Sequence, residues 1–113
     1  DTDIAGVPRR LRQIEWLRQV RARLSPGGVA AFNVHHIFGY EEHVDAIAAA
    51  FPRVYLLTPR DSNERIVLAL ARDEPLSLDA LRARAAALDA EGRWGIPLAE
   101  LAATATAWRT PPP

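Results

Sequence analysis

Apolar residues follow two different spacings along this chain. Three segments have apolar residues at steps of three and four positions, which predicts amphipathic helices over residues 11–24, 41–51 and 78–90. Three shorter runs are almost continuously apolar, which predicts strands at residues 29–34, 54–58 and 65–71. A last short helix is expected over residues 98–105. The predicted order is helix, strand, helix, strand, strand, helix.

This alternation predicts an α/β fold with a mostly parallel sheet. Because the run at 29–34 is continuous and mostly apolar, we expect a strand covered on both faces and central in the sheet of a parent domain. The polar turn after residue 58 predicts that the last two strands pair as an antiparallel hairpin at the sheet edge. Three strands are few for so much helix. We therefore interpret residues 1–75 as half of a doubly wound, three-layer domain, and residues 76–113 as a helical extension with a proline tail.

Composition excludes several classes of function. The 113 residues carry 14 basic and 14 acidic side chains, so no net charge attracts nucleic acid or an anionic membrane. There is no cysteine, which excludes a disulfide framework, a thiolate zinc site and a cysteine nucleophile. With no signal peptide or membrane-length apolar run in view, we expect a cytoplasmic protein. There is no methionine, even at position 1, which predicts that the chain was trimmed from a longer one.

Several short segments, in the same order along the chain, carry a resemblance to a known family. Residues 7–11 (VPRRL), 15–17 (EWL) and 24–29 (LSPGGV) resemble the second half of spermidine synthase-like proteins, the polyamine aminopropyltransferases, where such a turn feeds the fifth strand. The turn also resembles that of S-adenosylmethionine-dependent methyltransferases, which share the Rossmann-like fold. Residues 51–55 (FPRVY) and 66–69 (IVLA) are similar to the family's sixth and seventh strands.

The resemblance implies a transferase that uses S-adenosylmethionine or its decarboxylated form, with a small-molecule amine as acceptor. The family's glycine-rich cofactor loop would lie upstream of Asp1, so we expect this chain alone to bind no cofactor and to be inactive. The family's catalytic aspartate precedes a segment like residues 1–8. The resemblance therefore makes Asp1 or Asp3 a candidate for the remnant of that catalytic loop.

Two departures from the family leave the transferred group open. A Gln-Gly-Glu-like stretch after the fifth strand is replaced here by residues 33–36 (NVHH), and a Tyr-Pro-Ser-Gly-like segment that shapes the polyamine site is replaced by residues 58–63 (TPRDSN). Aminopropyl transfer and methyl transfer both remain compatible with the sequence.

Asn33, His35 and His36 are the candidate substrate-binding residues. They follow the first predicted strand, and ligands of open α/β sheets bind beyond the carboxyl ends of the strands. A histidine there could act as a base or orient an amine. The alternative is a polar loop that caps the next helix. The spacing of these histidines from Glu41, Glu42 and His43 matches no known metal site, so we expect no metal.

A second function class stays open, in which the chain is a non-catalytic self-association or interaction module. Its alanine-rich helices over residues 78–107 would mediate contacts, as in a homodimer, and it would tolerate His35→Ala and His36→Ala. The tryptophans fit either class: Trp94 and Trp108 could anchor the extension to the sheet or lie in a subunit contact, and Trp16 lies near the edge of an apolar helix face. Tyr55 is interpreted as a packing residue.

Overall fold

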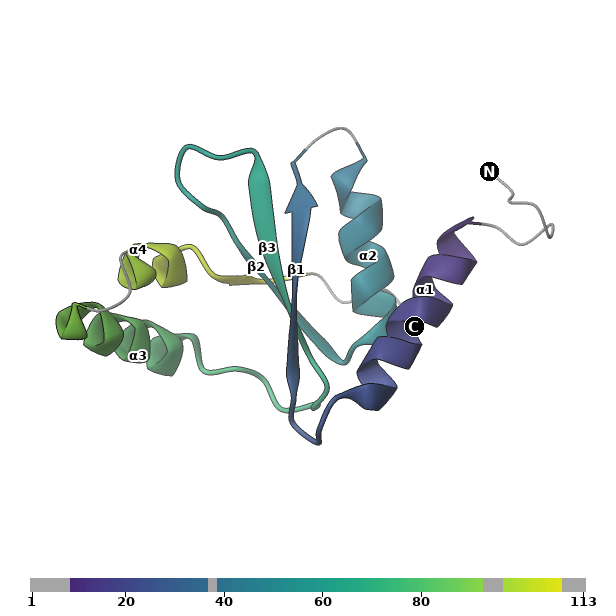
Figure 1. Cartoon of the computed structure of the whole chain (residues 1–113), viewed down its shortest axis with the longest axis horizontal. Coiled ribbons are helices and arrows are strands. Elements are labelled where there is room, and N and C mark those ends of the chain that lie inside the picture. Colours follow the sequence, from purple (N-terminus) through teal and green to yellow (C-terminus); the bar gives the residue numbers. More distant parts are fainter. Residues whose placement is uncertain (1–8, 37–38, 93–96, 109–113) are drawn as a thin grey trace.

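The computed structural model describes residues 9–36, 39–92 and 97–108, and Figure 1 shows their arrangement. The elements, in chain order, are α1 (Arg9–Arg23), β1 (Val29–His35), α2 (Tyr40–Ala50), β2 (Arg53–Leu57), β3 (Glu64–Leu70), α3 (Leu78–Glu91), α4 (Leu98–Ala103) and β4 (Thr106–Ala107). Each predicted helix and strand is present, and β4 is an addition that the pattern did not predict. Among the described helices, none combines the length and the apolar character that crossing a membrane requires.

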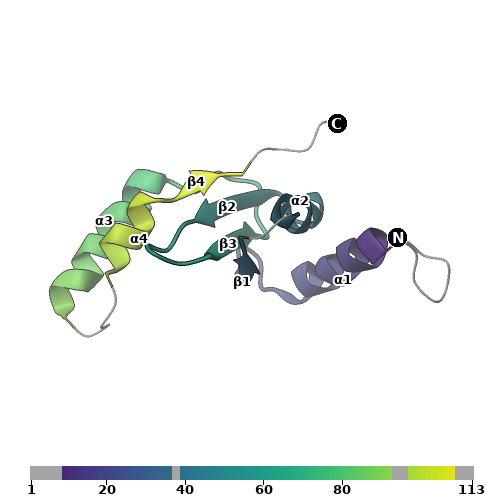
Figure 2. The ribbon, with the colours of Figure 1, turned by 90° about the horizontal axis from the view of Figure 1, so that it is seen from above.

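The four strands form one sheet in the order β1-β3-β2-β4, and every neighbouring pair is antiparallel. The prediction of a mostly parallel sheet is therefore wrong. Its physical cause is the position of β3, which lies between β1 and β2 and runs against both. As a result β1 and β2 point the same way without touching, and α2 connects them in a right-handed crossover (Figures 1 and 2).

Among the described strands, β1 lies at one edge of the sheet. Its expected central position in the sheet of a parent domain stays a prediction. The residues of β1 alternate between half-buried and exposed, so the expected cover on both faces is absent within the described part of the chain. The predicted hairpin of β2 and β3 is confirmed, although it occupies the middle of the sheet, flanked by β1 and β4.

The core lies between the sheet and the helices α1 and α2. Ala30 and Phe32 of β1 share a face with Ala69 and Val67 of β3, because residues paired across strands point to the same side, and Val34 lies on this face too. That face packs against Leu17 of α1 and against the apolar side of α2, which buries Val44, Ala46, Ile47 and Ala50. The helices α3 and α4 lie on the other side of the sheet, so the molecule has three layers (Figure 2).

Two polar caps order the α3–α4 hairpin. The Ser77 side chain accepts a hydrogen bond from the Ala80 N–H, so Ser77 is the N-cap of α3. Near the end of the same helix, the Asp89 carboxylate accepts from the backbone N–H groups of Leu98 and Ala99, at 2.9 and 2.8 Å. Since Pro97 provides no side-chain cap for α4, Asp89 supplies it from the neighbouring helix.

β4 attaches the segment after α4 to the sheet. Thr106 and Ala107 pair with Leu56 and Tyr55, and the Trp108 N–H donates to the Val54 carbonyl at 2.8 Å. The Trp108 indole packs against the core cluster, which confirms that it anchors the extension to the sheet. Trp94 lies outside the described residues.

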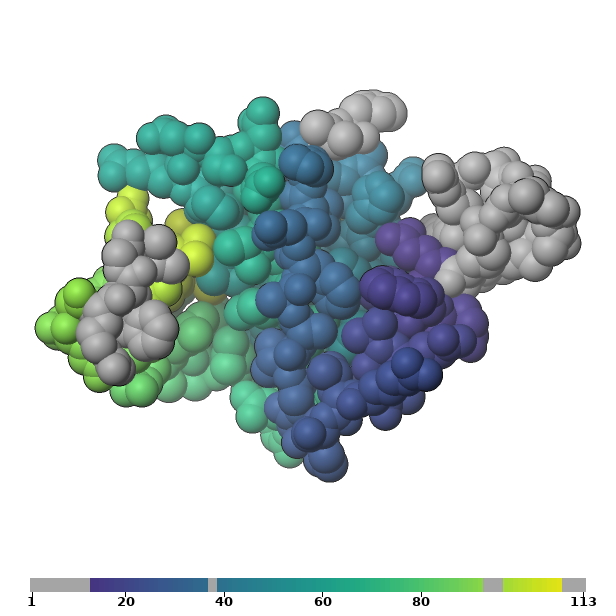
Figure 3. Space-filling view, in the orientation of Figure 1, coloured from purple at the N-terminus to yellow at the C-terminus, as the bar shows by residue number. Residues whose placement is uncertain are grey.

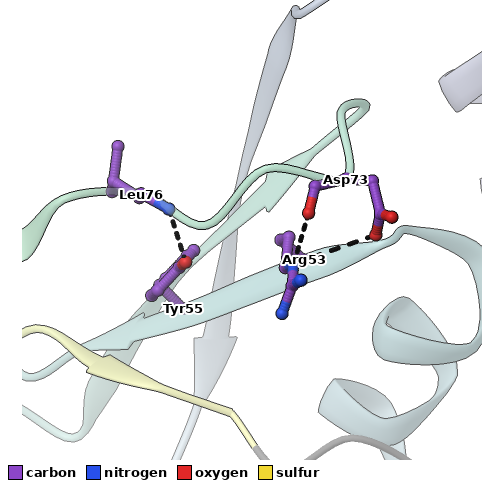
Figure 4. A network of polar contacts seen from close by, with 4 residues as sticks. All are labelled: Arg53, Tyr55, Asp73 and Leu76. Carbon is purple, nitrogen blue, oxygen red and sulfur yellow. Dashed lines mark hydrogen bonds and ion pairs between the residues drawn. The ribbon is translucent and has the colours of Figure 1, made fainter.

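The loop between β3 and α3 is held against β2 by two side chains (Figure 4). The Tyr55 hydroxyl accepts a hydrogen bond from the Leu76 N–H at 2.7 Å, and the Arg53 Nε donates to the Asp73 carbonyl at 2.7 Å. The Tyr55 side chain is buried, which confirms it as a packing residue.

We predict that Tyr55→Phe destabilises the fold. The ring stays buried, but the part-buried Leu76 N–H loses its acceptor, which costs about 1–2 kcal/mol. Thermal denaturation measures the effect. Tyr40→Phe is the matched control, since it keeps the ring contacts of Tyr40 with His36 and Trp108. Equal stability of Tyr55→Phe and the native chain would contradict the prediction.

We also predict that Asp89→Ala destabilises the α3–α4 hairpin by about 1–2 kcal/mol, because two N–H groups lose a charged cap. Denaturant titration followed by circular dichroism gives the free energy of unfolding. Asp73→Ala serves as control, because its carboxylate is exposed and its ion pair with Arg53 is long, at 3.9 Å. Two variants of equal stability would show that the cap contributes nothing.

Candidate functional site at the carboxyl ends of β1 and β2

The candidate site lies where β1 and β2 end. Because these two strands are parallel to each other, their carboxyl ends meet at the same end of the sheet. A hydrogen bond from the His36 N–H to the Asn63 carbonyl joins the end of β1 to the turn that follows β2. The segment of residues 33–36 and the turn of residues 58–63, far apart in sequence, are therefore neighbours in space.

The three candidate residues at the end of β1 do not form one cluster. Asn33 and His35 lie two positions apart in a strand, so their side chains share a face, and both are exposed. His36, one position further, turns to the other side and packs its ring against Tyr40 at the start of α2, with centroids 4.5 Å apart. The structure thus groups Asn33 with His35 and separates His36 from them.

His36 is the outermost member of an aromatic row. The Tyr40 ring also contacts Trp108 edge-on, with centroids 6.3 Å apart, and the Trp108 Nε1 donates to the Asp45 carboxylate at 2.9 Å. The row links the end of β1, the start of α2 and the segment after β4. The contact with Tyr40 gives the exposed His36 ring a packing role in this row.

A groove of about 1040 Å³ opens beside the turn after β2. Its walls come from the turn, the start of β3 and α4, and its lining consists of Thr58, Pro59, Arg60, Asp61, Ser62, Asn63, Arg65, Ile66, Pro97, Glu100, Leu101 and Thr104. The turn is shaped by Asp61, whose φ of 55° lies in the left-handed region that aspartate tolerates better than most residues.

Both signs of charge are present in this groove. An ion pair of 3.0 Å between Arg60 and Glu100 connects the turn to α4. Closer to the sheet, the Thr104 hydroxyl accepts from the Thr58 N–H at 2.8 Å, and the Arg65 guanidinium donates to the carbonyls of Ser62 and Glu64. A polar ligand could therefore meet guanidinium and carboxylate groups in the same groove.

The sequence analysis predicts a polar turn after residue 58 and names none of the groove residues as a candidate for binding. The sequence did contain a signal for the groove. The polar run of residues 58–63 follows β2, and β2 is parallel to β1, so both strands finish at the same end of the sheet. The role of α4 as a wall had no such signal. Asp1 and Asp3 lie outside the described residues. Among the described residues, no group of three or more His, Cys, Asp or Glu side chains could hold a metal ion.

Comparisons with known proteins give no assignment for this site. No family model matches the sequence, and neither a curated protein nor a solved structure with significant similarity was found.

We predict that Tyr40→Leu shifts the NMR resonances of the His36 ring and leaves those of the His35 ring in place. The Tyr40 ring current acts on His36 at 4.5 Å, whereas His35 belongs to the opposite face of β1. Two-dimensional spectra of the histidine side chains measure both in one sample. Equal shifts of the two rings would contradict the separation described above.

Proposed function

We propose that this chain forms the acceptor side of a transferase that uses S-adenosylmethionine or its decarboxylated form. The observation that carries the proposal is the β1–α2–β2 crossover with β3 inserted antiparallel between its strands. The resemblance matches residues 24–29 to the turn that feeds the family's fifth strand, and residues 51–55 and 66–69 to its sixth and seventh strands. The correspondence supports assigning β1, β2 and β3 to those three strands, in the order that the sequence resemblance implies.

The location of the polar side chains supports the same proposal. Ligands of open α/β sheets lie beyond the carboxyl ends of parallel strands, and the two parallel strands here end beside Asn33, His35 and the groove. In the proposal, the acceptor amine lies over this end of the sheet, with Asn33 and His35 facing it from β1. His36 is a positioning residue, since its ring contacts Tyr40.

The chemistry asked of these residues is modest. A sulfonium carbon is already activated for attack, so the protein contributes mainly proximity and orientation of the amine, together with a group that accepts its proton. In this proposal the exposed His35 accepts the proton of the amine, and Asn33 hydrogen-bonds the amine or the chain that carries it. The resemblance makes Asp1 or Asp3 a candidate for a further acidic group.

The test uses the polypeptide translated from the whole reading frame in which this sequence lies. Calorimetric titration with S-adenosylmethionine and with its decarboxylated form measures cofactor binding, and a transfer assay with a set of amines measures activity. We expect one cofactor to bind. We expect His35→Ala and Asn33→Ala to lower kcat/KM about 10- to 100-fold, with the cofactor Kd changed less than about twofold.

His43→Ala is the matched control, because His43 is an exposed histidine on the first turn of α2 that contacts Gln13 instead of the site. Asp1→Asn and Asp3→Asn complete the set. The proposal would be refuted if neither cofactor bound and if His35→Ala and His36→Ala left every measured property unchanged. That result would favour the non-catalytic interaction module.

A further inference from the structure

The groove beside the turn after β2 has an ion pair at its mouth. The Arg60 guanidinium of the turn and the Glu100 carboxylate of α4 meet at 3.0 Å across the two walls, and both side chains reach solvent, with 79% and 46% of their surface exposed. Figure 3 shows the surface hollowed between the turn (teal, upper left) and α4 (yellow) below it. Because an exposed ion pair contributes little to stability, a ligand with suitable charges can replace it.

Toward the sheet, the groove offers a ligand mainly apolar contacts. The Thr58 N–H donates to the Thr104 hydroxyl at 2.8 Å, and that hydroxyl donates to the Leu101 carbonyl at 2.7 Å, so these polar groups are already paired. The side chains of Ile66 and Leu101, both half-buried, belong to the lining. A chain of methylene groups suits such a lining, whereas polar groups of a ligand would lose hydrogen bonds to water there.

Ile66 also connects the groove to the candidate residues of β1. In the sheet it is paired with Asn33 of β1 on one side and with Leu57 of β2 on the other, and paired residues point to the same face. Asn33 and His35 therefore lie on the face of the sheet that carries the groove. β1 and β2 are two strand spacings apart, about 10 Å. An extended molecule of about that length would reach from the ion pair to Asn33 and His35.

The groove lies away from the place where a parent domain would continue. Its walls are the turn between β2 and β3, the start of β3, and α4, which leads into β4. Among the described strands, β4 is the farthest from β1 in the sheet. The half-domain interpretation gives the open edge of β1 to a preceding strand, so it leaves the groove available to a ligand.

Charge decides which class of small molecule fits. The lining carries two guanidinium groups, of Arg60 and Arg65, and two carboxylates, of Asp61 and Glu100. A diamine that paired with Glu100 would leave Arg60 without its carboxylate, and a dicarboxylate that paired with Arg60 would leave Glu100 without its cation. The head of an α-amino acid carries an ammonium and a carboxylate on one carbon, so it pairs with both groups at once.

We propose that the groove binds a free α-amino acid whose side chain ends in an amine and has about the length of lysine. Its carboxylate would pair with Arg60 and its α-ammonium with Glu100, while its methylene groups lie against the apolar lining. Its terminal amine would lie at Asn33 and His35. The role of this amine as the acceptor rests on the proposed function. In that role its nitrogen forms a bond to the sulfonium carbon, the thioether leaves with the electron pair of the broken bond, and the amine proton passes to His35.

Titration of lysine and three analogues into the ¹⁵N-labelled chain, without cofactor, tests the site. Cadaverine lacks the carboxylate of lysine, ε-aminocaproate lacks the α-amine, and norleucine lacks the terminal amine. We expect lysine to shift the amides of residues 58–63 and 98–104. Its Kd should be about tenfold lower than those of cadaverine and ε-aminocaproate, since each of these loses one charge-assisted contact. Norleucine should bind the groove but shift the side-chain amide of Asn33 less than lysine does.

Matched variants separate the two charges. Glu100→Gln should weaken lysine binding about 5- to 10-fold without weakening that of ε-aminocaproate. Arg60→Gln should weaken lysine binding by a similar factor without weakening that of cadaverine. Both side chains are exposed, so we expect both variants to fold. Glu15→Gln is the control, because Glu15 belongs to an exposed ion pair with Arg18 on α1, and it should leave lysine binding unchanged.

Three results would overturn the proposal. Cadaverine binding as tightly as lysine would favour a diamine. Equal lysine binding by the native chain, Glu100→Gln and Arg60→Gln, or the absence of shifts in the groove, would refute the head-group site. Equal shifts of the Asn33 side chain with lysine and norleucine would refute the position of the amine. Because no cofactor is added, lysine binding here and failure of both cofactors to bind the longer polypeptide would refute the transferase proposal alone.

Discussion

β3 holds this fold together, because it supplies the hydrogen-bonded neighbour that both β1 and β2 need. The two parallel strands are too far apart to pair with each other, and α2 can span them only if a strand fills the gap. Val67 and Ala69, on the face that β3 turns toward α2, are completely buried. A polar substitution at either position would disturb contacts to α2 and to both neighbouring strands at once. The alignment of residues 33–36 with the turn of residues 58–63 is a direct product of this insertion.

The sequence predicted the local elements well and their arrangement less well. Periodicity located α1, α2 and α3 because each presents an apolar stripe of several residues, and the polar turn of residues 59–63 marked the hairpin. Strand order is a property of distant pairs, and nothing in the local pattern distinguishes β3 beside β1 from β3 outside β2. β4 escaped prediction for a related reason: two residues, Thr106 and Ala107, carry no period, and they form a strand only because β2 offers an edge.

The candidate site divides in the same way. That Asn33, His35 and His36 follow a strand was readable from the sequence, and so was the end of the sheet at which they would lie. The side chain of His36 points away from those of Asn33 and His35, as the two-residue period of a strand predicts from the sequence. The α4 wall of the groove could not be predicted from the sequence, because the placement of α4 depends on a cap from Asp89 and on the Thr104 hydroxyl. The transferase function that the resemblance implies is a proposal.

The pairing of β4 with β2 has a consequence for the chain during its synthesis. Thr106 follows Leu57, the last residue of β2, by 49 positions. At translation rates of about 5–20 residues per second, the outer edge of β2 waits roughly 2–10 s for its partner. During that time the nascent chain exposes an unpaired strand on that side of its hairpin. This interval is when a ribosome-associated chaperone would have most to protect.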